Sequence, residues 1–591
     1  MEKRNSFIIS KGFRNYFRSM LIFMVGEQVC LSANMIFVGQ MVSPQAFAAL
    51  DLAIPVEGLI SALMLLLISG ASLPASRHIG NQDFKSAARA ITIAAISAVG
   101  ASILISSLAL LNIDSVVSFL SSDAELSYYL KDYLFVYFIQ FLPMSLASIF
   151  ILIAEIYGRP DIASKATIVS CVIDVVLDVI LLKFTDLGTA AVAWADLAGY
   201  LIQIGLIILF LYQEKSIFRF QLPKCKKEWV ALGKENIQSG VSYCIPNLNL
   251  AFISLVANYL VLNKLGTEAL FVWGVAYQVL TIVFMFLDCI GGTVLVTMGS
   301  MLVGFGEMDG LKVLVKKCLL ATLLTVGPVV ALVVAFPELA FALFGENSLE
   351  NPLLSNKWLR IIVLFSIPYS VCVIKAYLTQ TLERRAMSSA LFLGFVTLTI
   401  GSFALLALFK PEFMFLGLTV AGFAFVFLDL GASIPVRMRH PECRGYFLIP
   451  DNKGSEAFYE SVPYTYEGLD AALLDITKYL NGTTVPEALR GSINLCCEEL
   501  AMSLVKKNID KGDGYFFDIS IVEEDENVKV SIKDAGKPFN PVRSFDAPDG
   551  SDMNLEDETL SLRLVNVLCK DLTYNYMYGQ NAIFMNFSKK S

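Results

Sequence analysis

The chain has 591 residues, of which 56% are hydrophobic and only 17% are charged. Soluble domains carry about 25% charged residues, so this composition excludes an ordinary soluble enzyme, a disordered chain and a fibrous protein. The charge is also uneven, because residues 451–591 hold 24 acidic and 14 basic residues, whereas the first 450 hold 29 and 31. The acidic tail argues against a nucleic-acid partner.

The first 450 residues are predicted to cross a membrane many times. A bilayer span needs about 20 largely apolar residues, because lipid offers the backbone no hydrogen bonds. Twelve segments meet this requirement: 19–41, 50–75, 90–112, 131–157, 163–183, 190–212, 239–263, 268–302, 317–336, 358–380, 388–409 and 414–436. The eighth is long enough to be kinked, and we expect the kink at Gly291-Gly292.

Basic residues concentrate before the first of these segments and in every second loop after it. Lys224, Lys226 and Lys227 follow the sixth segment, for example, and Arg437 and Arg439 follow the twelfth. We expect the protein to lie in the plasma membrane, and the positive-inside rule then predicts that both termini are cytoplasmic. The even number of predicted spans agrees with this orientation.

Short motifs recur between the two halves of this region. Gly80-Asn-Gln-Asp83 follows the second span, and Gly304-Phe-Gly-Glu307 follows the eighth, 224 residues later. Two parallel six-helix repeats are a transporter architecture with the substrate path between them. A helical anchor for the tail is the alternative, although an anchor needs only one helix. The expected division is an N-terminus (1–18), a first lobe (19–212), a cytoplasmic linker (213–238) and a second lobe (239–440).

Four further motifs lie in the first half, in the order Ile36-Phe-Val-Gly-Gln40, Ile79-Gly-Asn-Gln-Asp83, Tyr157-Gly-Arg-Pro160 and Asp174-Val-Val-Leu-Asp178. With these motifs the chain resembles the multidrug and toxic compound extrusion (MATE) transporters over most of residues 10–440. The resemblance implies an all-α polytopic membrane protein that exports small organic, drug-like or cationic solutes in exchange for H⁺ or Na⁺.

Two acids in the fifth span are the candidate coupling residues. Asp174 and Asp178 are four residues apart, on one face of a helix. Two carboxylates this close in a low dielectric cannot easily both stay ionised, so one holds a proton or both share a cation. The family builds its site from an acid on the first helix and an Asn-x-x-x-Asp pair on the fifth. The resemblance places the first-helix position on Asn34, and Glu27, two turns earlier, is expected to join.

Other polar residues in the spans have weaker interpretations. Asp288 and Lys375 are expected to form a polar site in the second lobe, and Asp196 and Asp429 are interpreted as bonding across the bundle. No metal site is predicted, because the chain has only two histidines. The eleven scattered cysteines are interpreted as small apolar residues or reduced thiols.

A linker (441–455) leads to a predicted α+β domain over residues 456–591. Its expected helices are 467–480, 484–508 and 557–569, and its expected strands are 515–521, 528–533, 572–578 and 582–587. The second helix begins at a capping box, Thr484-Val-Pro-Glu487.

This order of elements, with Glu498-Glu499, Asp534-x-Gly536-x-Pro-Phe539 and Gly579-Gln-Asn581, resembles the histidine-kinase-like ATPase fold, closest to the anti-sigma-factor serine kinases. The resemblance implies Glu499 as catalytic base and an ATP/Mg²⁺ site, listed here by residue: Ser503, Asp534, Gly536, Phe539, Thr559 and Ser561. Ser503 stands where the family has a Mg²⁺-binding Asn, and Thr559 and Ser561 stand where it has phosphate-binding glycines. These departures favour a nucleotide-sensing module, or one that binds a cytoplasmic regulatory protein, over an active kinase. An acidic helix without a ligand remains the alternative.

Three functions follow. The first is a cation-coupled exporter with a regulatory tail. The second is a membrane-tethered kinase or anti-sigma-type signalling protein whose helix bundle is the sensor. The third is a flippase for a lipid-linked precursor, which needs a basic groove, and Lys375 is the one buried basic residue that the sequence offers for it.

Overall fold

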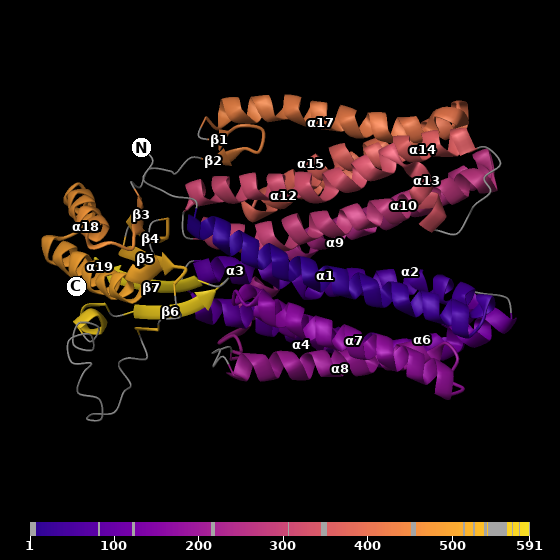
Figure 1. Cartoon of the computed structure of the whole chain (residues 1–591), viewed down its shortest axis with the longest axis horizontal. Helices are drawn as coiled ribbons and strands as arrows, with labels where there is room; N and C mark the ends of the chain where they lie inside the picture. The colour runs from indigo at the N-terminus through magenta and orange to yellow at the C-terminus, as the bar shows by residue number, and fades with distance from the viewer. Residues whose placement is uncertain are drawn as a thin grey trace.

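The computed structural model has a long helical bundle with a small α+β domain at one end (Figure 1). We call this end of the bundle the domain-bearing end. The structure describes residues 7–80, 83–120, 124–213, 219–304, 307–343, 352–441, 443–450, 457–511, 514–523, 526–536, 540–541, 564–569, 571–577 and 580–589.

The bundle consists of two lobes that lie side by side (Figure 1). The N-lobe contains α1 (Phe7–Met41), α2 (Pro44–Leu67), α3 (Ser72–Gly80), α4 (Phe84–Leu111), α5 (Ile113–Leu120), α6 (Ala124–Ile156), α7 (Pro160–Phe184) and α8 (Ala190–Gln213). The C-lobe contains α9 (Lys226–Leu265), α10 (Thr267–Leu287), α11 (Val296–Gly304), α12 (Met308–Ala335), α13 (Pro337–Leu343), α14 (Pro352–Leu364), α15 (Ser366–Thr381), α16 (Arg385–Phe409) and α17 (Met414–Arg439).

Nine helical stretches among the described residues are long and apolar enough to cross a membrane. The remaining three of the twelve predicted spans coincide with α1, α7 and α9, which are also long helices. Helix α7 is less apolar because it carries Asp174, Asp178 and Lys183 within its length. The chain is therefore a multi-pass membrane protein, and the total of twelve spans stays a prediction.

Helix irregularity occurs where the two adjacent glycines were expected to cause it. Residues Asp288–Leu295 form a π-helical segment between α10 and α11, and Gly291 and Gly292 lie inside it. A Cβ on Gly291 would stand 2.5 Å from a ring carbon of Tyr377 on α15. The glycines thus allow both the altered winding and a close approach of the neighbouring helix.

The two lobes meet at a seam of backbone contacts near the domain-bearing end. A Cβ on Gly80 would lie 2.5 Å from the Met301 carbonyl oxygen, and a Cβ on Gly304 would lie 2.7 Å from the Arg77 carbonyl oxygen. An ion pair between Arg77 and Glu383 joins the lobes beside this seam. The lobes are therefore closed against each other at this end.

The C-terminal domain (residues 457–589) is a five-stranded antiparallel sheet with two helices on one face. The strand order is β3-β4-β5-β7-β6, from β3 (Phe458–Pro463), β4 (Phe516–Glu523), β5 (Asn527–Asp534), β6 (Asp571–Met577) and β7 (Gln580–Ser588). Helices α18 (Tyr466–Asn481) and α19 (Glu487–Asn508) bury their apolar faces on this sheet around Leu469, Ile493 and Phe517. The predicted α+β class is confirmed.

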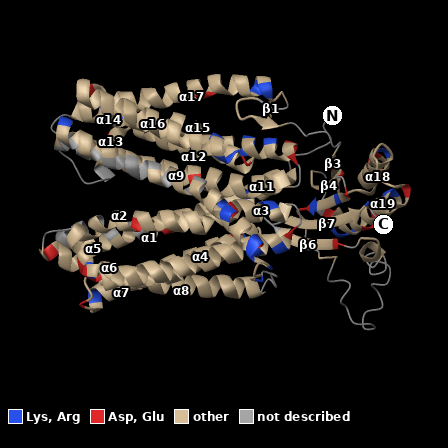
Figure 2. Ribbon diagram, turned by 180° about the vertical axis from the view of Figure 1, so that it is seen from behind, with Lys and Arg blue, Asp and Glu red and all other residues tan. Residues whose placement is uncertain are grey.

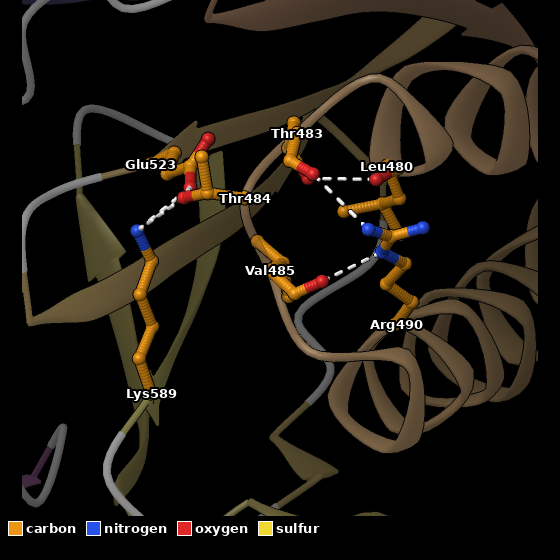
Figure 3. Close-up of polar contacts among 7 residues, drawn as sticks. All are labelled: Leu480, Thr483, Thr484, Val485, Arg490, Glu523 and Lys589. Carbon is orange, nitrogen blue, oxygen red and sulfur yellow. Dashed lines mark hydrogen bonds and ion pairs between the residues drawn. The ribbon is translucent and has the colours of Figure 1, made fainter.

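The predicted capping box of α19 is wrong. Helix α19 begins at Glu487, and the Thr484 hydroxyl donates to the Glu523 carboxylate on β4 instead of capping the helix. Arg490 holds the preceding loop, donating to the carbonyls of Val485 (2.7 Å) and Thr483 (3.1 Å), as Figure 3 shows. Tertiary contacts to the strand thus replace the local motif.

Several boundaries differ from those expected. Helix α1 begins at Phe7 and α9 at Lys226, so both extend into the expected cytoplasmic N-terminus (1–18) and cytoplasmic linker (213–238). The expected linker 441–455 contains a small hairpin of β1 (Cys443–Arg444) and β2 (Ile449–Pro450), and strand β3 follows it without having been predicted. Residues 564–568 are helical, and 557–563 of the expected last helix lie outside the described residues.

The cysteines are not all unpaired. Cys30 on α1 and Cys171 on α7 form a disulfide, with their Cα atoms 6.1 Å apart. The two helices pack along each other, which brings residues 141 positions apart in the sequence within bonding reach. Sequence spacing could not indicate this pair.

Candidate functional site

A cluster of buried polar side chains lies inside the N-lobe, where α1, α7 and α8 pack together. Asp174 and Asp178 lie one turn apart on α7 and are 4% and 0% exposed, and Asn34 on α1 is 7% exposed. We call Asn34, Asp174, Asp178 and Asp196 the carboxylate cluster. The structure thus brings together the three residues expected to form the coupling site.

Asp196, on α8, is the centre of this cluster. Its Oδ1 accepts a hydrogen bond of 3.0 Å from Asn34 Nδ2, and its carboxyl group also contacts Asp174 and Gln140 within hydrogen-bonding reach. The sequence interpretation had left Asp196 as a general cross-bundle bond. The signal that marks it is its position in the middle of an apolar helix, where an acid is costly unless it has a specific role.

Contact between two carboxyl groups has a direct chemical consequence. Asp174 and Asp196 can hydrogen-bond to each other only when one of them carries a proton, because two carboxylates offer acceptors alone. Asp174 Oδ1, both oxygens of Asp178 and Asn34 Oδ1 are buried and have no hydrogen-bond donor among the described residues. Buried acceptors without donors are suited to taking up a cation. A proton shared between Asp174 and Asp196, or a cation beside the unbonded oxygens, would satisfy these groups.

Glu27 does not join this cluster through hydrogen bonds in the described part of the chain. Its side chain is exposed on α1, although it lies seven residues before Asn34 on the same helix. Glu57, on α2, instead accepts a 2.7 Å hydrogen bond from the Tyr133 hydroxyl on α6. The predicted participation of Glu27 in the site remains a prediction.

The expected pair of Asp288 and Lys375 in the C-lobe is wrong. Lys375 Nζ donates to Asp429 (2.6 Å) and to Ser433 Oγ (2.9 Å), both on α17. Asp288 accepts a 2.8 Å hydrogen bond from the Tyr377 hydroxyl. Lys375 and Tyr377 are two residues apart on α15, so their side chains point about 200° apart around the helix. The helical phase separates the two groups that the sequence interpretation had paired.

Lys375 is fully buried and is neutralised where it lies. Its side chain is 0% exposed and its partner Asp429 is 9% exposed. The ammonium group also lies 4.0 Å from the centre of the Tyr446 ring, from the segment that follows α17. This pair fits a structural link within the C-lobe.

In the C-terminal domain, Asp534 is already occupied by protein partners. It is 1% exposed, and its carboxylate accepts hydrogen bonds from the Tyr464 hydroxyl (3.1 Å) and from Asn581 Nδ2 (2.8 Å). A Cβ on Gly536 would stand 2.5 Å from the Asn508 amide oxygen, so that side chain fills the space beside the glycine. In this arrangement the Asp534 carboxylate is therefore bonded to protein groups, and its binding of an adenine base stays a prediction.

The remaining predicted nucleotide residues are described only in part, so their role stays a prediction. Glu499 and Ser503 lie one turn apart on α19, and Ser503 is 3% exposed. Phe539, Thr559 and Ser561 lie outside the described residues. Among the residues that the structure describes, no three His, Cys, Asp or Glu side chains form a group that would hold a metal ion.

Comparisons with known proteins agree with the helical architecture. Residues 20–180 match the family model MatE. A MOP superfamily transporter from Pyrococcus furiosus superposes with a TM-score of 0.64 at 16% identity, covering 74% of this chain and 98% of that one. A mutant of a Vibrio cholerae MATE transporter gives 0.64 at 16% identity, covering 75% and 99%.

A multidrug resistance MATE family transporter in an outward-facing conformation also gives 0.64, at 17% identity, covering 74% of this chain and 98% of that one. No curated protein matches the chain. Likeness at these identities establishes the fold alone. Residues 20–180 thus match the MatE family model, and the helical bundle has the fold of the MATE transporter structures.

Proposed function

We propose that this protein is a cation-coupled efflux transporter of small organic, drug-like or cationic solutes. The carboxylate cluster is the observation that supports the proposal, because contact between two carboxyl groups inside the N-lobe favours uptake of a proton there. Taking up or releasing that proton changes the charge of a buried site. A buried charge change of this kind biases which arrangement of two lobes is more stable.

We propose H⁺ as the coupling ion. A single shared proton would join the Asp174 and Asp196 carboxyl groups directly, because one of them would then donate a hydrogen bond to the other. Asn34 Oδ1 and the Asp178 oxygens are the acceptors available for Na⁺ if the Asp174–Asp196 contact opens. Coupling to H⁺ predicts that a pH gradient drives transport, whereas coupling to Na⁺ predicts that a Na⁺ gradient drives it.

We propose that the domain-bearing end faces the cytoplasm and that the C-terminal domain regulates transport from that side. The basic residues of the loops support this orientation under the positive-inside rule. In Figure 2, Lys and Arg gather where the helices meet the domain. A cytoplasmic protein bound to this domain is a proposed regulator. ATP and Mg²⁺ remain proposed ligands whose binding would require Asp534 to exchange its present partners.

The signalling and flippase alternatives have less support. A kinase needs an accessible nucleotide loop, and Asp534 is buried and bonded. A flippase needs free basic groups facing its substrate, and Lys375 is paired with Asp429.

The test is transport by purified protein in liposomes loaded with a cationic dye. We expect a pH gradient to drive dye movement, and a Na⁺ gradient at equal pH to leave the dye in place. Asp174→Asn should abolish the pH-driven movement, with Glu412→Gln, on the short turn before α17, as a matched control. Dye movement driven by Na⁺ alone would overturn the choice of ion, and full activity of Asp174→Asn would overturn the coupling site.

A further inference from the structure

The C-terminal sheet has a second packed face besides the one covered by α18 and α19. Ala582 and Phe584 of β7 are buried among residues of the helical bundle, including Ile9 and Phe13 of α1, and not in the core of their own domain. Beside them, Ser520 and Ser531 are 5% and 3% exposed on neighbouring strands. We call this the docking face. It seats the domain directly on the end of the bundle (Figure 1).

The docking face holds the N-lobe through several contacts. Gln580 Nε2 donates to the carbonyl of Ile8, and Lys11 Nζ donates to the carbonyl of Ala535 at 2.9 Å. The Phe7 ring packs against Tyr515 with 5.4 Å between ring centres. These residues belong to the first turns of α1, so the domain is fixed to the N-lobe by both apolar and polar contacts.

The same face reaches the C-lobe through an ion pair. Lys533 Nζ lies 2.9 Å from Glu307 Oε1, and the two side chains are 17% and 2% exposed. Lys533 is two residues before Ala535, which receives the bond from Lys11. One strand end of the domain therefore contacts both lobes.

Glu307 also differs from its repeat counterpart in the N-lobe. Asp83 precedes α4, and its carboxylate caps that helix by accepting from the Ser86 amide at 3.0 Å. Glu307 occupies the same place before α12, yet its side chain makes no capping bond to the helix. Its carboxylate is turned to Lys533. The C-lobe member of the repeat thus has a contact outside the bundle in place of the local one.

Glu307 also lies at the seam, three residues after Gly304. Separating the lobes here moves Glu307 away from Gly80, and from the domain fixed to α1. The Lys533–Glu307 pair must then stretch or break.

We propose that the docking face makes the C-terminal domain a clamp across the two lobes, with the Lys533–Glu307 pair as its latch on the C-lobe. The domain travels with the N-lobe, and the latch opens when the lobes part at the domain-bearing end. This inference rests on the alternating movement of the lobes in the proposed function. It does not depend on the coupling ion, the substrate or a nucleotide.

The test measures the separation of the lobes directly. Spin labels at Lys85→Cys and Asp309→Cys sit on exposed positions in the first turns of α4 and α12, on the two sides of the seam. The background carries Cys225→Ser, which removes the free cysteine that is exposed in the described part of the chain. Double electron–electron resonance measures the distance between the two spin labels on the full chain in lipid nanodiscs.

We expect one short distance in this parent protein. Lys533→Met and Glu307→Gln should each raise the population of a longer distance by about fivefold or more. The charge swap, Lys533→Glu with Glu307→Lys, should return the distribution to the short distance. Lys506→Met, exposed on α19 and on the opposite side of the sheet, is the matched control and should change nothing.

Unchanged distances in both single variants would overturn the latch, as would a charge swap that behaves like the single variants. Monodisperse elution of each variant establishes that it is folded. Because the readout is a distance, a protein that fails to move dye in liposomes still gives an answer. Failure of the latch and failure of the transport proposal are therefore separate results.

Discussion

Gly80 and Gly304 hold the same position in the two halves of the chain, and their backbones touch across the seam between the lobes. A Cβ built on Gly304 would lie 3.0 Å from the Gly80 Cα atom, and one built on Gly80 would lie 3.1 Å from the Gly304 Cα atom. A side chain at either position would therefore crowd the backbone of the other glycine. The repeat found in the sequence places its two copies at the symmetric centre of the closed end.

Substituting one of these glycines should weaken the closed end. In Gly80→Ala the new methyl group would lie 2.5 Å from the Met301 carbonyl oxygen, which is backbone and cannot rotate away. We expect a loss of about 1–3 kcal/mol, as for overpacked cores, measured as a lower thermal unfolding midpoint in detergent. Gly100→Ala on α4 is the control, because nothing lies within 4 Å of that Cβ. Equal midpoints for the two variants would contradict this account of the seam.

Removing one partner of the buried pair in the C-lobe should be costly. Lys375→Met leaves Asp429 without its ammonium partner in the bundle, and such single removals cost about 3–5 kcal/mol. Lys375→Met combined with Asp429→Leu should recover most of that loss, because no unpaired charge remains. Thermal unfolding of the three proteins measures this. A double variant less stable than Lys375→Met would argue that the ion pair itself is required.

Asp196 should matter to transport as much as Asp174. In Asp196→Asn the amide oxygen can still accept the hydrogen bond from Asn34, but the carboxyl group that contacts Asp174 is lost. We expect pH-driven dye efflux to fall at least about tenfold, as when a buried proton-carrying group is lost. Ser106→Ala, which loses a bond from α4 to the Phe138 carbonyl, tests for general disturbance of the N-lobe and should keep most activity. Normal efflux by Asp196→Asn would remove it from the site.

The loop between α18 and α19 should lose stability in acid. Burial raises the pKa of Glu523, but the hydrogen bonds from Lys589 (2.7 Å) and Thr484 outweigh it and hold the pKa below its usual value. A lowered pKa stabilises the folded state at neutral pH, and this contribution disappears as pH falls through the folded-state pKa.

Glu523→Gln should therefore lower stability at pH 7 by about 0.5 kcal/mol, the scale of an ion pair at the protein surface. The difference in stability between Glu523→Gln and the parent protein should become smaller between about pH 5 and pH 3. Unfolding midpoints across this range measure it, with Glu498→Gln, exposed on α19, as the control. A stability difference that grows in acid would contradict the predicted lowering of the Glu523 pKa on folding.

The parts of the fold that sequence patterns predicted well are those set by local periodicity. Apolar length located the helices, and the paired glycines located the π-helical segment. Strand β3 was missed because Phe458–Pro463 lacks a clear alternation and depends on pairing with β4, which lies more than 50 residues later. Such pairings are decided by tertiary packing and not by the segment itself.

The carboxylate cluster was predicted only in part, because spacing along one helix is visible in the sequence and packing between helices is not. Asp174 and Asp178 share one helix, so their proximity follows from spacing alone. The role of Asp196 depends on how α8 packs against α1 and α7, which no spacing encodes. The error over Lys375 was one of helical phase: the partner was expected to be Asp288, in the π-helical segment after α10, and it is Asp429 on α17.

Helix α1 runs without a break from Phe7 to Met41 and contains no proline. Lys11, near its start, is bonded to the C-terminal domain, and Asn34, near its end, is bonded to Asp196. At 1.5 Å per residue these two attachments are about 35 Å apart. One unbroken helix therefore links the C-terminal domain to the carboxylate cluster, so a tilt of the helix at one attachment would displace the other.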